Sequence, residues 1–210
     1  MQVLMVKMAK HMKLILMNKC SRFLLCSVFI SCYSLHAQDC GVERWKVKTL
    51  SDADTVFVNF DTIRVSSVHE QVNLNAPYGK INSRLASETA IYSIDCFIIG
   101  FAKEDDKDIH IIVEDVNTDE TMVIEIVSHE CSDIQNTSRY KTIKDLNEWF
   151  NNNIGISHHS FTFLKKHKLV TITGVGFWDF MHGQKGMATN GREIHPVLSM
   201  KFKQEPKQTK

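Results

Sequence analysis

The chain has 210 residues, of which 43% are hydrophobic, and its 25 basic residues almost balance its 24 acidic ones. Without residues 1–38, about 172 residues remain, which suits one domain with a substantial core. Those first 38 residues hold five basic residues and no acidic one, so the remainder carries a formal charge of −4. An acidic balance argues against a protein that coats nucleic acid by charge alone, because such domains are usually clearly basic.

Residues 1–38 have the three parts of a secretory signal peptide. Basic residues precede the apolar run Phe23–Leu35, and the small residue Ala37 follows it. This run is shorter than the roughly 20 apolar residues that a membrane-spanning helix needs. We therefore predict cleavage near Ala37 or Gln38 and export to the periplasm or the extracellular space. Cleavage before Cys32, as in a lipoprotein, is the alternative.

Residues 39–90 are interpreted as an N-terminal extension packed on the main domain. Its segment ERWKVK favours a strand with Trp45 and Val47 facing inward and the basic side chains facing water. In the other interpretation, Arg44, Lys46 and Lys48 contact phosphates of a ligand. Further along the extension, strands are predicted at 56–60 and 62–65, and a loop at 73–83.

The apolar pattern sharpens in the main domain, residues 91–202. Its third predicted strand, TMVIEIV, alternates, with Met122, Ile124 and Ile126 on one face and Glu125 on the other. A helix is predicted to begin at a capping box formed by Thr142 with Asp145 and to end near Gly155. The predicted strands are 91–102, 109–114, 121–127, 169–178 and 194–202, followed by a disordered tail, 203–210.

This order, β-β-β-α-β-β, is that of an OB-fold, a β-rich five-stranded barrel with a helix between its third and fourth strands. Such folds bind ligands on strands two and three and on the loops after strands one and four. The rival architecture is an open α+β sheet or a sandwich that includes the extension.

Three cysteines follow the predicted leader. Cys40 and Cys131 lie in polar, loop-like surroundings, and we expect them to form a disulfide in an oxidising compartment. Cys96 lies in an apolar run and is predicted to be a buried thiol. Three free thiols are the alternative.

Two polar clusters fall where an OB-fold binds ligands. In the first, the acidic turn at 104–108, Asp108 and His110 are two residues apart on an extended segment and share a face. A carboxylate and an imidazole on one face can bind a divalent metal or form an acid/base pair. A solvated acidic turn with His110 at a strand edge is the simpler interpretation.

The second cluster is FMHGQKGMATNGREIHPVL, at 180–198. Its glycines allow close backbone approach to a ligand, and Glu193 and His195 share a strand face. It contains neither a zinc signature nor a phosphate-wrapping loop. A hairpin loop with an Asn190-Gly191 turn is the alternative.

Together the two clusters predict one site. Its expected metal ligands are Asp106, Asp179 and His195, and the bound ion is an unspecified divalent metal. The expected acid/base residues are Asp108, His110, His182 and Glu193. The residues expected to bind the ligand are Arg44, Lys48, Gly183, Gln184 and Asn190.

Three stretches carry a resemblance: CGVERWKVKT at 40–49, EDDKDIHIIVED at 104–115 and TGVGFWDFMHGQKGMATNGREIHPVL at 173–198. They resemble a widespread group of uncharacterised secreted bacterial proteins, which implies export and a compact β-rich domain and no particular activity. The strand order is also similar to that of staphylococcal-type thermonucleases. The arginine and aspartate motif of that family has no counterpart here, so this likeness is topological only.

Three functions are compatible with these features. The first is a secreted OB-like domain that binds a polar or anionic ligand, such as nucleic acid or an oligosaccharide. The second is a metal-dependent hydrolase of the nuclease or phosphodiesterase type. The third is a structural or interaction module of the cell envelope. Strands two and three, residues 109–127, contain no aromatic residue, which counts against base stacking on that face.

Overall fold

The computed structural model describes residues 40–41, 43–181 and 183–203. The predicted leader (1–38) and all of the predicted tail except its first residue lie outside this part of the chain. The extension folds as short elements that lead into the main sheet. They are α2 (Trp45–Lys48), a 3-10 helix (Ala53–Phe57), β1 (Ile63–Ser66), α3 (Val68–Val72) and a second 3-10 helix (Ala86–Glu88).

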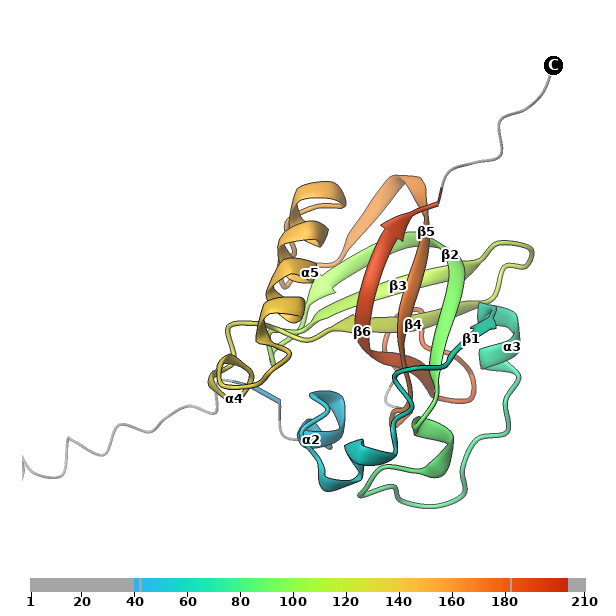
Figure 1. Cartoon of the computed structure of the whole chain (residues 1–210). Helices are drawn as coiled ribbons and strands as arrows, with labels where there is room; N and C mark the ends of the chain where they lie inside the picture. The colour runs from blue at the N-terminus through green and yellow to red at the C-terminus, as the bar shows by residue number, and fades with distance from the viewer. Residues whose placement is uncertain (1–39, 42, 182, 204–210) are drawn as a thin grey trace, which may run out of the picture. The chain divides into compact units, whose positions relative to one another are not determined.

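The main domain is strand-rich, as predicted (Figure 1). Five strands carry most of it, with α5 lying along one side of them and α3 of the extension on the other. The elements are β2 (Ile91–Lys103), β3 (Ile109–Asp115), β4 (Thr121–Ile126), α4 (Ser132–Gln135), α5 (Tyr140–Asn153), β5 (Thr162–Trp178) and β6 (Arg192–Phe202).

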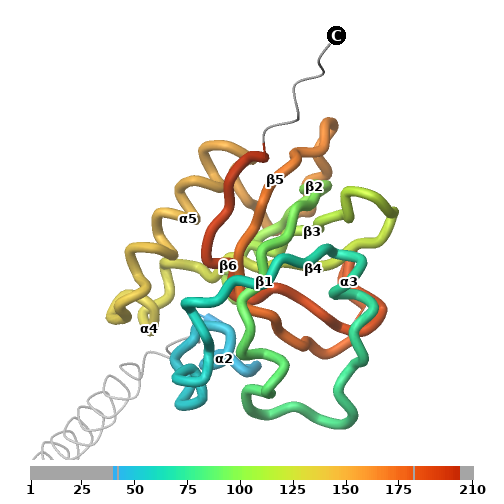
Figure 2. Tube along the Cα trace, turned by 45° about the vertical axis from the view of Figure 1, so that its right-hand side comes forward, coloured from blue at the N-terminus to red at the C-terminus, as the bar shows by residue number. Residues whose placement is uncertain are grey.

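The described strands form one mixed sheet of six, not the five predicted, because β1 joins the sheet parallel to β2. The sheet order is β1-β2-β3-β4-β6-β5, and β5 pairs again with β2. The path of these strands can be followed in Figure 2. The β4–β6 pair is parallel and is in register only at Val123 with Glu193 and at Ile124 with Ile194. The other pairs among β2 to β6 are antiparallel.

Alternation along β4 and β6 decides which side chains enter the core. Met122, Ile124 and Ile126 of β4 belong to the main apolar cluster, together with Ile194 of β6. Glu125 and the pair Glu193 and His195 therefore point to the other face, since neighbouring strand residues point in opposite directions. This outer face is nevertheless buried: Glu125 is 3% exposed, and Glu193 and His195 are 0% exposed.

The loop between β5 and β6 covers part of this outer face. The Lys185 carbonyl oxygen lies 3.2 Å from Nε2 of His110 in β3. Gly186 has a φ of 74°, and a Cβ there would lie 2.3 Å from a methyl carbon of Ile112. Only glycine allows this close approach without strain, so the loop can seal the strands beneath it.

Several predicted elements differ from the observed ones. Residues 45–48 form the short helix α2 instead of a strand; Trp45 and Val47 are buried as expected, but so are Arg44 and Lys48. Residues 56–60 form no strand, because a 3-10 helix runs to Phe57 and leaves Val56 and Phe57 exposed. No capping box starts α5, which begins at Tyr140 without a side-chain cap. β5 begins at Thr162, because its polar first half pairs with β2.

The predicted disulfide is confirmed. Cys40 and Cys131 are bonded with their Cα atoms 5.9 Å apart, and Cys96 is a buried free thiol. The bridge fixes the start of the extension beside a small apolar cluster formed by Trp45, Val127 and Ile134 with their neighbours. Among the described residues, no helix has the length and apolar character needed to span a membrane.

Candidate functional site

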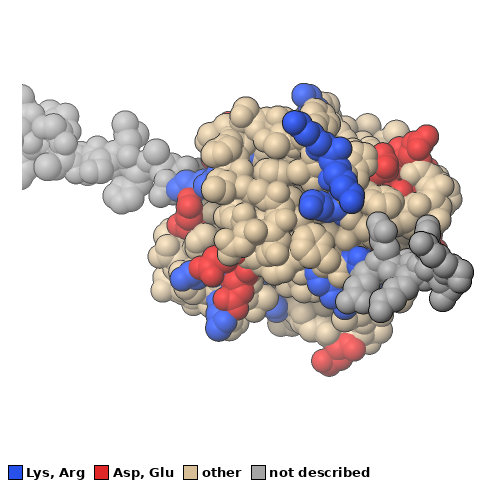
Figure 3. All heavy atoms as spheres, turned by 90° about the horizontal axis from the view of Figure 1, so that it is seen from above, with Lys and Arg blue, Asp and Glu red and all other residues tan. Residues whose placement is uncertain are grey.

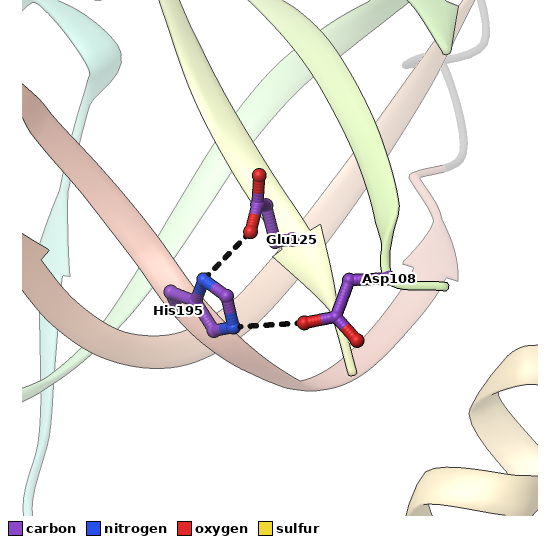
Figure 4. Close-up of side chains that lie close together, drawn as sticks. All are labelled: Asp108, Glu125 and His195. Atoms are coloured by element: carbon purple, nitrogen blue, oxygen red, sulfur yellow. Dashed lines mark ion pairs between the residues drawn. The ribbon is translucent and has the colours of Figure 1, made fainter. Parts of the chain in front are cut away.

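Three strands bring two carboxylates and an imidazole together (Figure 4). Asp108 directly precedes β3, Glu125 lies near the end of β4, and His195 lies in β6. The His195 Nδ1 is 2.8 Å from Oε2 of Glu125, and its Nε2 is 3.4 Å from Oδ2 of Asp108. We call these three residues the Asp–Glu–His cluster. They are almost fully buried.

Neighbouring groups hold the two carboxylates in place. The backbone N–H of Ser128 donates to Oδ1 of Asp108 at 2.8 Å. The Oε1 of Glu125 lies 3.2 Å from Nδ1 of His110. The Nε2 of His110 faces the Lys185 carbonyl oxygen, which can only accept, so Nε2 carries a proton. His110 thus links Glu125 to the covering loop.

Several buried polar atoms in and beside the cluster make no hydrogen bond within the described chain. They include Oδ2 of Asp108, both ring nitrogens of His195 and both carboxylate oxygens of Glu193. The His195 nitrogens are near carboxylates but are not aligned for hydrogen bonds. Burying such a group unpaired costs about 1–3 kcal/mol, so this concentration needs an explanation. A ligand that accepts electron pairs from oxygen and nitrogen would satisfy these atoms.

The cluster is a candidate site for a divalent metal ion. Its three residues each offer one ligand atom, and these atoms lie within 4.8 Å of one another. Two ligand atoms on a tetrahedral ion with bonds of 2.0–2.1 Å are about 3.4 Å apart. This is the distance between His195 Nε2 and Asp108 Oδ2. One imidazole with two carboxylates suits zinc or another first-row ion.

Burial and neighbouring charges give the carboxylates of this region different pKa values. Burial raises the pKa of Asp108 to about 6, despite the opposing effect of His195. Burial also raises the pKa of Glu193 well above its usual value, and the charges of Glu125 and Asp179 add to this. The pKa of Glu125 is lowered well below its usual value, because His195 and His110 outweigh the effect of burial. Ionised and protonated carboxylates therefore coexist here, as in many acid/base sites.

A pocket of about 220 Å³ opens beside Glu125. Lys48 is the basic residue in its lining, and its Nζ is 3.9 Å from Oε2 of Glu125. Burial opposes the charge of Lys48, but the carboxylates around it, Glu125 foremost, raise its pKa above the usual value. The lining residues are Gly41, Glu43, Lys48, Glu104, Asp105, Asp106, Glu125, Asp179 and Gln184. So acidic a lining favours a cation as the first ligand.

The start of the extension forms one wall of this pocket. Gly41 follows the disulfide-bonded Cys40, and a Cβ on Gly41 would lie 2.9 Å from the Trp45 ring and 3.0 Å from Oδ2 of Asp106. The lack of a side chain therefore lets this wall approach the acidic turn closely. The disulfide holds the wall against Cys131, in the segment between β4 and α4.

Most of the residues predicted from sequence lie in this region. Asp108 and His195 belong to the cluster, and His110 contacts it through Glu125. Glu193 is buried near the pocket-lining residues without a hydrogen-bond partner. The predicted residues that line the pocket are Lys48, Asp106, Asp179 and Gln184.

The other predicted residues have different places. Arg44 is buried, forms an ion pair with Glu88 at 2.6 Å and donates to the Trp178 carbonyl, so its guanidinium serves the fold and not a ligand. The amide of Asn190 donates to the carbonyls of Gln71 and Leu74. It therefore fixes the β5–β6 loop against the extension and is not free to bind a ligand. Gly183 is exposed with a φ of 80°. His182 lies outside the described residues.

Sequence reasoning missed Glu125 as a site residue. The available signal was a lone carboxylate in the otherwise apolar strand TMVIEIV, where a charged side chain needs a partner. Its partners come from β3 and β6, and Lys48 comes from the extension. The site is assigned from geometry and chemistry alone, since neither a family model nor a curated protein matches this chain.

Proposed function

We propose that the protein is a metal-dependent hydrolase whose divalent ion is bound by Asp108, Glu125 and His195. The observation that carries this proposal is the buried cluster itself, with ligand atoms within 4.8 Å of one another and beside an open acidic pocket. Three protein ligands with access for water or substrate are typical of catalytic zinc sites, whereas structural sites are closed by four.

The neighbouring side chains suit hydrolysis of an anionic substrate. An ion at this site supplies a Lewis acid and lowers the pKa of a bound water. Lys48 places a buried ammonium group beside Glu125, where it can pair with a substrate phosphate. His110 contacts Oε1 of Glu125 and would fix the orientation of this metal ligand. A phosphodiester is the substrate class that combines these features.

We also propose that β2 to β6 form an OB-like barrel. The pairing order, the parallel β4–β6 pair and the helix α5 between β4 and β5 support this assignment. Export, by the predicted leader, is part of the same proposal and is supported by the disulfide, which persists in oxidising compartments. The division into an extension (39–90) and a main domain (91–202) also stays a proposal.

A second candidate function is binding of a polar or anionic ligand without its transformation. The observation in its favour is Lys48, a cationic group in the pocket lining that can hold an anion by itself. The two functions differ in one measurable respect, because only the hydrolase requires the metal for turnover.

The test uses purified protein from residue 39 onward. Its metal content is measured by inductively coupled plasma mass spectrometry, and hydrolysis of bis(p-nitrophenyl) phosphate is followed with and without a chelator. We expect about one equivalent of zinc or manganese and metal-dependent turnover, both lost in Glu125→Gln. Glu148→Gln, on the exposed face of α5, is the matched control and should retain both. Wild-type protein with neither metal nor turnover after incubation with these ions would refute the proposal.

A further inference from the structure

An aromatic and basic surface lies along the first half of β5 and the neighbouring part of the β5–β6 loop. It consists of two phenylalanines and three lysines, and we call it the β5 track: Phe161, Phe163, Lys165, Lys166 and Lys185. Its residues belong to β5, to the residue before it and to the β5–β6 loop.

The two aromatic rings of the track are fixed on the strands beneath. The Phe161 and Phe163 ring centroids are 4.8 Å apart, and Phe163 is 61% exposed although its ring is large and apolar. The Phe161 ring packs against Gly100 of β2, where a Cβ would lie only 2.5 Å from the ring. A fixed and exposed aromatic face is the feature on which unpaired bases stack.

Positive charge accompanies the rings. The Lys185 Nζ lies 5.5 Å from the Phe161 centroid and 5.7 Å from the Phe163 centroid, so an ammonium group stands over the aromatic face. Lys165 and Lys166 are exposed further along β5. Seen from above in Figure 3, basic side chains gather in one run on the surface at this end of the molecule. Alternating aromatic and cationic groups match a chain of bases and phosphates.

The track lies close to the residues of the candidate site. The backbone carbonyl of Lys185 contacts His110, which contacts Glu125 of the Asp–Glu–His cluster. The His110 ring is 6.4 Å from the Phe161 ring, and Gln184, next to Lys185, lines the pocket. A nucleic-acid strand stacked on Phe163 therefore lies near the proposed metal site.

We infer that the β5 track binds single-stranded nucleic acid and directs it to the acidic pocket. Binding by the track stands on its own contacts, whereas delivery to a catalytic centre rests on the proposed hydrolase function. Lysines beside the rings favour nucleic acid over an uncharged oligosaccharide, which would gain only the stacking. The bases stack on β5 and not on the strands that OB-folds commonly use, which lack aromatic residues here.

The test is fluorescence anisotropy with a labelled oligothymidylate of 12 nucleotides and protein kept metal-free by EDTA. We expect binding at 50 mM NaCl that weakens at 200 mM, and a loss of affinity of about fivefold or more in Phe163→Ala. Lys165→Ala with Lys166→Ala should weaken binding and reduce its salt dependence. Tyr78→Ala and Lys80→Ala, on the exposed loop before the second 3-10 helix, are the matched controls and should bind like the wild type.

Three outcomes would overturn the inference. They are no binding at 50 mM NaCl, equal affinity in Phe163→Ala, and Phe163-dependent binding of chitohexaose without binding of the oligonucleotide. Glu125→Gln separates this inference from the proposed function, because it should abolish turnover and leave anisotropy unchanged. Binding without metal-dependent turnover in the wild type would uphold the β5 track and refute the hydrolase.

Discussion

At the scale of single residues, the Asp–Glu–His cluster depends on the groups that hold Glu125 in place. A buried carboxylate is tolerated only when charges or hydrogen bonds compensate its desolvation. His195, His110 and Lys48 provide this compensation from three different segments. Glu125 is therefore both a candidate metal ligand and the point at which these segments meet.

His110 should act as a positioning residue for Glu125. We expect His110→Ala to lower metal affinity about 10- to 100-fold, since groups that orient a metal ligand typically have effects of this size. Isothermal titration calorimetry with Zn²⁺ measures the change. His159→Ala, whose imidazole is 72% exposed, is the control. An unchanged Kd in His110→Ala would show that Glu125 needs no such support.

A second residue-scale prediction concerns acid stability. Burial opposes ionisation of Asp52, but hydrogen bonds from Arg84 and Thr55 outweigh it and lower its pKa. A depressed pKa in the folded state adds stability above the unfolded value of about 3.9, and this is lost as pH falls through the folded pKa. Asp52→Asn should therefore cost up to about 1 kcal/mol at pH 7, because the pair is partly open to solvent.

Urea unfolding of wild type and Asp52→Asn at pH 7 and at pH 3 measures this difference. The gap between the two proteins should narrow at the lower pH, where the aspartate begins to be protonated. A gap that stays constant with pH would mean that Asp52 contributes by shape and not by charge.

At the scale of elements, the segment from Cys40 to Lys48 is a wall of the pocket that one covalent bond fastens to the main domain. Replacing both Cys40 and Cys131 by serine should lower the free energy of unfolding by about 2–4 kcal/mol. The same change should weaken metal binding, because Gly41, Glu43 and Lys48 line the pocket. Urea unfolding and calorimetry check both effects, with Cys96→Ala as the control for loss of a thiol. Unaltered metal affinity would show that the segment from Cys40 to Lys48 does not contribute to metal binding.

Strand alternation made much of the fold predictable from sequence. The pattern in TMVIEIV placed Met122, Ile124 and Ile126 on one face, and they lie in the core. Alternation also placed Glu193 and His195 on a common face, around the core residue Ile194. It did not show that a loop covers part of the opposite face of β3. That depends on Gly186 packing against Ile112, a contact between distant segments with no local signal.

At the scale of the whole molecule, the site is assembled from segments far apart in the chain. The strand order implied that the turn before β3 and the loop before β6 would meet, and Asp108 and His195 do lie together. Lys48 of the extension was among the residues expected to bind the ligand, and it lines the pocket, although the favoured interpretation of residues 43–48 was a strand with its basic side chains in water. The segment forms the helix α2 instead, and Trp45 and Val47 are buried in it.

The parallel contact between β4 and β6 has a consequence for how this domain folds. It is in register at only two residue pairs, and its strands are separated in sequence by α4, α5 and β5. Contacts of such long range are costly in loop entropy and tend to form late in folding. Glu125 lies on β4 and His195 on β6, so an ion that bound both residues would link the two strands directly. Ligand capture and the last step of folding would then be a single event.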